Sequence, residues 1–172
     1  MSARRVKRVI DASALIQLLE VCESVLALSS GQVVVIAVPV PVLYEKRSLT
    51  EERCRALGLE IVRGETEQLL EAAARKGKGG LSFQDWSCVI IAQDAGWGII
   101  SEDKPLIKVA RKEGLKVTGC FDLLAELYEK SLLRIDDAQT YARNLQANNP
   151  GYIPYDDVVA LIERLRRTKP KG

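Results

Sequence analysis

The chain of 172 residues contains no histidine, so it cannot use imidazole for acid–base catalysis or as a metal ligand. Aromatic residues make up only 5% of the sequence and do not alternate with basic residues, so no stacking platform for single-stranded nucleic acid is expected. The formal net charge is only +2, which excludes a globally basic nucleic-acid coat. Attraction to a polyanion would therefore depend on local patches of positive charge.

Long hydrophobic runs are also missing. No stretch of 18 apolar residues is present, so no membrane span is expected. Residues 1–11 lack the apolar stretch and small-residue cleavage site of a signal peptide, which predicts a cytoplasmic protein. The four cysteines, Cys22, Cys54, Cys88 and Cys120, form no CxxC pattern, so buried thiols are expected rather than a zinc site, while pairing in the fold stays open.

Strand-like and helix-like segments alternate along the first two thirds of the chain. Uninterrupted β-branched runs such as QVVVIAV are typical of strands buried in a parallel sheet. The alternation predicts an α/β fold, a three-layer α/β/α sandwich with a central, mainly parallel sheet and additional C-terminal helices. The expected strands are 6–11, 32–38, 59–62, 97–101 and 115–119, and the expected helices between them are 13–26, 42–48, 65–76, 82–95 and 105–113.

The pattern becomes purely helical after Gly119, with candidate helices at 121–130, 136–146 and 154–167. We expect residues 1–120 to form a catalytic domain and residues 121–168 to form a helical extension packed on it. Residues 169–172 are expected to be a basic tail. The extension either adds cover to the core or provides a surface for a dimer or another partner.

Four acidic residues follow or adjoin the expected strands. Asp11 and Asp103 come directly after the first and fourth strands, and Glu45 follows the second. Asp85 opens the helix that leads back to the fourth strand, so it belongs to the same edge of the sheet. Open parallel sheets bind ligands at the carboxyl ends of their strands, and the sequence therefore predicts a site there.

Each acid also has an ordinary structural explanation. Asp11 and Asp103 precede helices as N-caps, Asp85 stands three residues after Ser82 in a capping-box pattern, and Glu45 fits a solvated helix face. Together, however, four neighbouring carboxylates would repel one another without a cation. Oxygen ligands without histidine indicate Mg²⁺ or Mn²⁺, the ions that metal-dependent nucleases use.

Four segments resemble the motifs of the PIN-domain nucleases in order and spacing: VIDASALI, VPVPVLYE, LSFQDWSCVIIAQDAG and IISEDKPLIKVARKEGLKV. The resemblance extends over residues 6–119 and looks like that of the VapC-like toxin ribonucleases. The continuation GCFDLLAELYEKSLL, with a helical end at VVALIERL, is similar to a prokaryotic subgroup with extra C-terminal helices.

The resemblance implies a catalytic role for the acids, as ligands of Mg²⁺ or Mn²⁺ whose bound water attacks an RNA phosphodiester. It also implies that Ser13 and Ser101 orient these ligands, although Ser13 equally fits a helix cap. The implied protein is a divalent-metal-dependent endoribonuclease, the toxin of a type II toxin–antitoxin pair, with a small antitoxin as partner and a homodimeric state. The implied catalytic and metal-binding residues are Asp11, Glu45, Asp85 and Asp103.

Three basic residues near these motifs are candidates for contacts with RNA phosphates: Lys46, Arg47 and Lys104. Each fits a solvated surface as well. Glu102 departs from the family, which often has Asn or Asp at that position, and either approaches the metal or points away. Trp86, in the apolar helix, is expected in the core.

Other functions are compatible with parts of the pattern. A receiver-like phosphoacceptor domain also has strand-end acids and a nearby lysine, as in Asp103-Lys104, but it needs paired acids after the first strand, where this chain has one. A PIN-like fold could instead serve as a non-catalytic RNA- or protein-binding scaffold, or as a housekeeping RNA-processing nuclease. Cleavage assays distinguish the scaffold from an enzyme.

Overall fold

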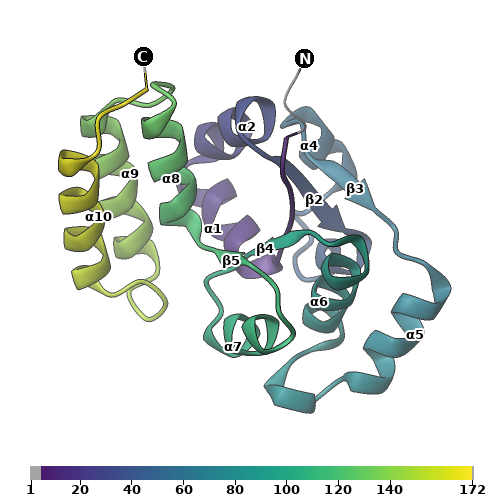
Figure 1. Cartoon of the computed structure of the whole chain (residues 1–172). Coiled ribbons are helices and arrows are strands. Elements are labelled where there is room, and N and C mark those ends of the chain that lie inside the picture. The colour runs from purple at the N-terminus through teal and green to yellow at the C-terminus, as the bar shows by residue number, and fades with distance from the viewer. Residues whose placement is uncertain (1–4, 172) are drawn as a thin grey trace.

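A five-stranded parallel sheet forms the centre of the molecule in the computed structural model, which describes residues 5–171 (Figure 1). The first four residues of the expected first domain and the last residue of the expected tail lie outside this range. The strand order is β3-β2-β1-β4-β5, and every neighbouring pair is parallel. The strands are β1 (Lys7–Ile10), β2 (Val35–Pro39), β3 (Glu60–Val62), β4 (Gly98–Ile100) and β5 (Val117–Thr118).

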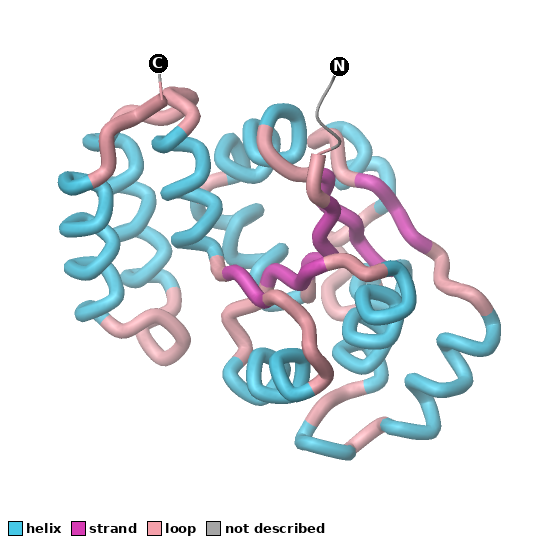
Figure 2. Tube along the Cα trace, in the orientation of Figure 1, coloured by secondary structure: helices cyan, strands magenta, loops and turns pink. Residues whose placement is uncertain are grey.

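Helices cover both faces of this sheet, which confirms the three-layer α/β/α sandwich predicted from the sequence (Figure 2). Helix α6 contacts β1, β2 and β4, whereas α1 and α2 lie on the other side of β1 and β2 (Figure 1). The helices between the strands are α1 (Ala12–Val21), α2 (Glu23–Gln32), α3 (Val40–Leu43), α4 (Glu51–Ala56), α5 (Thr66–Arg75), α6 (Phe83–Ala95) and α7 (Lys104–Lys112), with a 3₁₀ turn, η1 (Lys78–Gly80), before α6.

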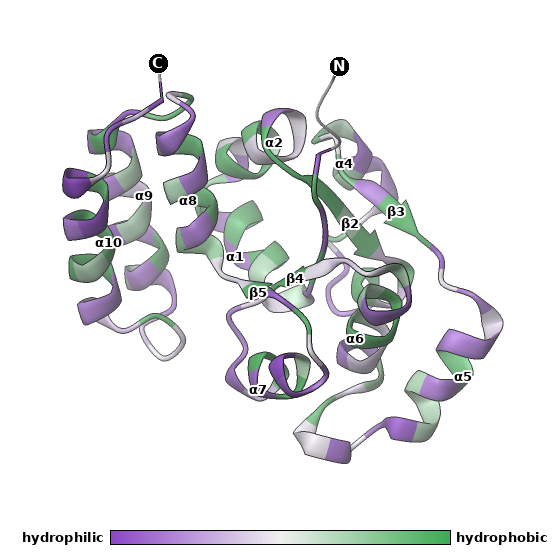
Figure 3. Cartoon of the chain, in the orientation of Figure 1, coloured by the Kyte–Doolittle hydropathy of each residue, from purple (hydrophilic) through white to green (hydrophobic). Residues whose placement is uncertain are grey.

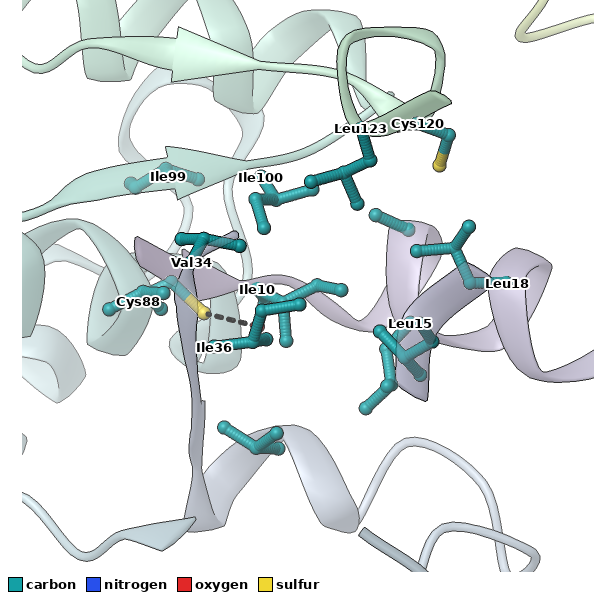
Figure 4. Packing of buried hydrophobic residues seen from close by; sticks show 14 of the residues in the cluster. Ile10, Leu15, Leu18, Val34, Ile36, Cys88, Ile99, Ile100, Cys120 and Leu123 are labelled. Atoms are coloured by element: carbon teal, nitrogen blue, oxygen red, sulfur yellow. Dashed lines mark hydrogen bonds between the residues drawn. The ribbon is translucent and has the colours of Figure 1, made fainter. Parts of the chain in front are cut away.

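The core lies between the sheet and these helices. Val9 and Ile10 in the central strand β1 and Ile36 in its neighbour β2 are fully buried, as expected for strands covered on both faces. Close packing continues into α1 through Leu15 and Leu18 (Figure 4). All four cysteines are buried free thiols, and the sulfur of Cys88 lies 4.0 Å from the carbonyl oxygen of Ile10 in β1. Trp86 is buried in α6, as predicted.

Two local expectations were wrong. The segment expected as one helix over 13–26 is two helices, α1 and α2, bent by 115° at Cys22. Both halves turn apolar side chains inward, which the periodic pattern alone could not separate from one continuous helix. The helix expected over 42–48 is the single turn α3, and it ends at Leu43.

No single helix within residues 5–171 is long and apolar enough to span a membrane. The bent pair α1–α2 reaches that length and apolar character only when its two helices are counted together.

The chain ends in three helices that stand side by side at one flank of the molecule (Figure 1). Helix α8 contacts α2, and α9 contacts α1, so this group joins the layer formed by α1 and α2. Each helix is amphipathic: hydrophobic and hydrophilic residues are interspersed along its ribbon (Figure 3), and apolar residues such as Leu123, Ala142 and Leu161 are buried. The three are α8 (Cys120–Glu129), α9 (Ile135–Asn148) and α10 (Tyr155–Arg167).

A nearly buried ion pair ties this group to the sheet. The guanidinium of Arg8 in β1 lies 2.9 Å from the carboxylate of Glu126 in α8, and the side chain of Arg8 is only 8% exposed. Replacing Glu126 by Ala leaves a buried guanidinium without a counter-charge. Because Glu126 itself is 23% exposed, we expect the free energy of unfolding to fall by about 2–3 kcal/mol, somewhat below the cost of a fully buried pair.

Urea denaturation measures this effect. Glu163→Ala is the matched control because Glu163 forms a 3.9 Å pair with Arg167 on the surface of α10, which we expect to contribute less than about 0.5 kcal/mol. The double variant Arg8→Met with Glu126→Leu should recover most of the lost stability, since it removes both charges. Equal stability of Glu126→Ala and Glu163→Ala would show that the Arg8–Glu126 pair contributes nothing.

Candidate functional site

The four acids expected to form the site line one hollow at the carboxyl edge of the sheet. Asp11 follows β1, Asp103 follows β4, Glu45 follows the turn after β2, and Asp85 lies in the first turn of α6. The hollow has a volume of about 360 Å³. Its other lining residues are Ala12, Ser13, Ile16, Gly80, Ser82 and Pro105.

Asp11 is the buried centre of this hollow, with 1% of its surface exposed. It caps α1 by accepting a hydrogen bond from the backbone amide of Ala14 at 2.8 Å. The hydroxyl of Ser101 donates to Oδ2 at 2.5 Å, and that of Ser13 donates to both carboxylate oxygens. Burial nevertheless raises the pKa of Asp11 to about 7, against the opposing effect of these hydrogen bonds. A positive charge beside Asp11 would favour its ionised form.

Asp103 is the N-cap of α7, and Asp85 takes part in the capping box of α6, whose N-cap is Ser82; each uses one carboxylate oxygen for this purpose. Asp103 Oδ2 accepts from the amide of Leu106 at 3.0 Å. Asp85 Oδ2 accepts from the amide and the hydroxyl of Ser82, which completes a capping box at the start of α6. The capping explanation and the site explanation therefore do not exclude each other, because a carboxylate has a second oxygen to offer.

Glu45 lies in a turn after α3 rather than on a helix face. Its amide donates to the carbonyl oxygen of Val42 at 3.2 Å, which holds the turn, and its side chain is exposed. Pro39 and Pro41 stop β2 and restrict the chain as it leaves the sheet. A long, exposed side chain at this place reaches the hollow from outside, whereas Asp11 approaches it from the core.

The side chains by which the described residues line the hollow fit a hard divalent cation, because their polar groups are carboxylates and hydroxyls and none carries nitrogen or sulfur. The spacing is wider than a closed coordination sphere, because within residues 5–171 no three acidic, cysteine or histidine side chains stand close enough to hold one ion. The residues that would hold a cation are Asp11, Asp85, Asp103 and Glu45.

Ser101 connects two of these acids. Its hydroxyl donates to Asp11 Oδ2 and accepts from the amide of Asp103 at 3.0 Å. In Ser101→Ala both contacts disappear, and we expect the affinity for Mn²⁺ to fall by about 10- to 100-fold, as for other partners of metal ligands. Ser24→Ala is the control, since Ser24 is exposed and contacts Tyr141 far along the chain. An unchanged Mn²⁺ affinity in a folded Ser101→Ala protein would contradict a role for Ser101 in the site.

Ser13 does not cap α1, because Asp11 is the N-cap. Its hydroxyl lies 2.9 Å from Asp11 Oδ2 and 3.0 Å from Oδ1. Of the two explanations for Ser13, the structure supports contact with the acid. Glu102 points away from the hollow and accepts a 2.5 Å hydrogen bond from the amide of Cys120, at the start of α8. Burial raises the pKa of Glu102.

None of the three basic candidates lines the hollow. Lys46 pairs with Glu20 on α1, and Arg47 is exposed in the turn after Glu45. Lys104 is the first residue of α7 and, with Lys108 of the same helix, lines a separate shallow depression. These three residues are therefore close to the acids along the chain, but in the structure they do not line the hollow.

The loop before α6 also contributes to the hollow, which the sequence pattern did not indicate. Gly80 of the glycine-rich segment 76–80 and Ser82, the N-cap of α6, both line it. Gly79 and Gly80 have φ values of +66° and +77°, so this loop depends on glycine. A Cβ on Gly79 would stand 2.8 Å from the side chain of Val109, so the loop also needs glycine to pack against α7. Its glycine content was the available signal.

Known proteins match this chain in structure but not in overall sequence. No family model and no curated protein matches the sequence. Among solved structures, a PilT N-terminus domain protein, SSO1118, from the hyperthermophilic archaeon Sulfolobus solfataricus P2 aligns with a TM-score of 0.53 and 20% identity over 70% of this chain and 92% of that one. PAE2754 from Pyrobaculum aerophilum aligns with a TM-score of 0.49 and 17% identity over 72% and 97%. The sheet order, the layers and the first of these likenesses show that the chain has the fold of a PilT N-terminus (PIN) domain.

Proposed function

We propose that this protein is a divalent-metal-dependent ribonuclease that hydrolyses RNA phosphodiesters. One observation carries the proposal: four carboxylates from four separate segments line one hollow at the carboxyl edge of a parallel sheet. A protein gains no stability from gathering like charges around a buried acid, so the arrangement favours a cationic ligand. The nuclease motifs that the sequence resembles contain these same four residues, and the PIN fold is a nuclease-type fold.

The proposed roles follow from the position of each residue. Asp11, held by two hydroxyls and an amide, would be the fixed ligand. Asp85 and Asp103 would each offer the carboxylate oxygen that accepts no hydrogen bond at the start of a helix, and exposed Glu45 would close the site from the solvent side. When bound, Mg²⁺ or Mn²⁺ would activate water and stabilise the negative charge that develops on the phosphate. Hydrolysis adds water across one P–O bond, and the leaving ribose oxygen takes up a proton.

The biological role is part of the proposal and is supported by the sequence motifs. Their resemblance to toxin ribonucleases suggests the toxin of a type II toxin–antitoxin pair, with a small antitoxin as partner and a homodimeric state. Co-expression with the product of a neighbouring small open reading frame tests this role. Relief of growth inhibition and recovery of a stable complex would support it, whereas a lack of toxicity on expression would favour RNA processing.

A non-catalytic scaffold is the second candidate. It is favoured by the spacing of the acids, since no three of them within residues 5–171 stand close enough to hold one ion. Such a protein would bind RNA or a protein partner through the same fold. It would show no metal-dependent cleavage of any substrate, so one assay separates the two candidates.

The test is incubation of the purified protein with a mixture of structured RNAs in Mn²⁺, Mg²⁺ or EDTA. We expect new RNA ends in Mn²⁺ or Mg²⁺ and none in EDTA. Cleavage that continues in EDTA would contradict a metal-dependent mechanism. A lack of cleavage under every condition, with RNA binding retained, would favour the scaffold.

A further inference from the structure

A second cavity is lined by residues of α7, of β5 and the start of α8, and of α10. Its volume is about 360 Å³, within the range of small-ligand sites. Apolar walls come from α7, α8 and α10 through Ile107, Phe121 and Leu161. We call this cavity the α7–α10 cleft.

The cleft adjoins the acid hollow. Ser101 lines the cleft while its hydroxyl donates to Asp11 in the hollow. Helix α7 is a wall shared by both, because Pro105 lines the hollow and Arg111 lines the cleft. Six residues of helix separate the two, about 9 Å along the axis. A single strand of nucleic acid held in the hollow would therefore reach the cleft within a few nucleotides.

The rim of the cleft on α7 is cationic. Lys104, Lys108 and Arg111 stand on one side of the helix and are all exposed. These three residues and Ile107 line a shallow depression, and no acidic residue is among its described lining residues. Arg111 and Ile107 also line the cleft. This row has the character of a contact for phosphates, which are bound by lysine and arginine side chains.

The floor of the cleft is different, because it presents carboxylates. Glu102 accepts from the amide of Cys120, and Asp122 accepts from the amide of Gly119, so the first amides of α8 are already occupied. A Cβ on Gly119 would lie 2.5 Å from Glu102 Oε1, so the glycine makes room for this carboxylate. The second oxygen of Glu102 remains an acceptor for N–H groups in a pocket with an aromatic wall, Phe121.

From this arrangement we propose that the α7–α10 cleft binds one base of the RNA strand, a few nucleotides from the acid hollow, while the α7 rim holds the adjoining phosphates. The inference rests on the proposed function for its choice of RNA. A base combines a flat apolar face with N–H donors on its edge, which matches apolar walls around a carboxylate. The polyanionic backbone matches the cationic rim. The cleft itself is lined by three carboxylates, Glu102, Asp122 and Asp157, of which Asp122 pairs with Arg164 at 3.3 Å, so base and phosphate have separate places.

The test measures the binding of a short, fluorescein-labelled single-stranded RNA of mixed sequence by fluorescence anisotropy. EDTA is present so that cleavage does not interfere. Arg111→Ala should weaken binding by about tenfold and reduce the slope of log affinity against log salt by about 1, since one phosphate contact is lost. Ala160→Leu fills the cleft from α10 without changing charge. It should weaken binding by about fivefold or more and leave the salt slope unchanged.

Arg143→Ala is the charge-matched control, because Arg143 is exposed on α9 and does not line the cleft. Circular dichroism confirms folding of each variant. If the wild type cleaves RNA but Arg111→Ala and Ala160→Leu bind like Arg143→Ala, the cleft is not a base site and the proposed function stands. If the wild type binds RNA without ever cleaving it and the two variants lose affinity as expected, the cleft is supported and the ribonuclease is not. A wild type that binds no RNA overturns the cleft.

Discussion

Asp85→Asn and Asp11→Asn should each reduce Mn²⁺-dependent RNA cleavage by about a thousandfold while the protein stays folded. Both substitutions keep size and shape and remove one negative charge. Asparagine is also a good N-cap, so the hydrogen bond from the amide of Ala14 to residue 11 can persist. At residue 85, the third position of α6, the amide oxygen of asparagine can still accept from the amide and hydroxyl of Ser82. Each substitution removes a carboxylate charge that would bind the divalent cation. Removal of one preorganised electrostatic group typically lowers the rate by two to three orders of magnitude.

Asp94→Asn provides the matched control for this prediction. Asp94 lies on α6 like Asp85, but at the other end of the helix, where it is exposed and accepts a hydrogen bond from Gln68. We expect its rate of cleavage to equal that of the wild type. Rates are compared at saturating RNA and fixed Mn²⁺, with thermal unfolding as the check of folding. Wild-type rates in a folded Asp85→Asn or Asp11→Asn protein would remove these residues from the mechanism.

The second large effect concerns stability against pH in EDTA. Burial raises the pKa of Asp11 from 3.8 to about 7, so between these values the folded protein holds a proton that the unfolded chain has released. Stability is therefore greatest below about pH 4 for this group and decreases as the pH rises toward 7. A difference of about 3 pH units corresponds to a loss on the order of 4 kcal/mol, an upper bound for Asp11 alone.

Urea denaturation at several pH values between 4 and 8 measures this dependence. Asp11→Asn should flatten it and should be more stable than the wild type at pH 8 in EDTA, although it is inactive. Asp94→Asn should retain the wild-type dependence. Saturating Mn²⁺ should restore much of the lost stability of the wild type at pH 8, because a ligand of the folded state stabilises it by mass action. Parallel pH curves for wild type and Asp11→Asn would show that burial of Asp11 has little energetic cost.

The sequence predicted the parts of the fold that depend on local pattern. β-branched runs predicted the buried strands, and the alternation of strands and helices predicted that the strands are parallel. The positions of Asp11 and Asp103 after strands predicted the edge at which they meet. Parallel topology is a strong constraint, since carboxyl ends of neighbouring strands share one edge. The convergence of four acids was therefore accessible before the structure.

Other parts depend on tertiary packing and were not accessible. The bend lies at Cys22, whose φ of −152° and ψ of 61° end α1 before α2 begins, and a buried apolar stripe looks the same for one helix or two. The turn that carries Glu45 was mistaken for a helix because a proline at its start fits both. The α7–α10 cleft joins Arg111 to residues some fifty positions later in the chain, and no local pattern links them.

The central claim is that the acid hollow binds a divalent cation, and calorimetric titration with Mn²⁺ tests it most directly. The protein should bind Mn²⁺ with a defined stoichiometry, Asp94→Asn should bind it equally, and Asp11→Asn and Asp85→Asn should lose at least about 100-fold in affinity. Binding of Mn²⁺ with wild-type affinity by both folded variants, or no binding by the wild type, would contradict the claim.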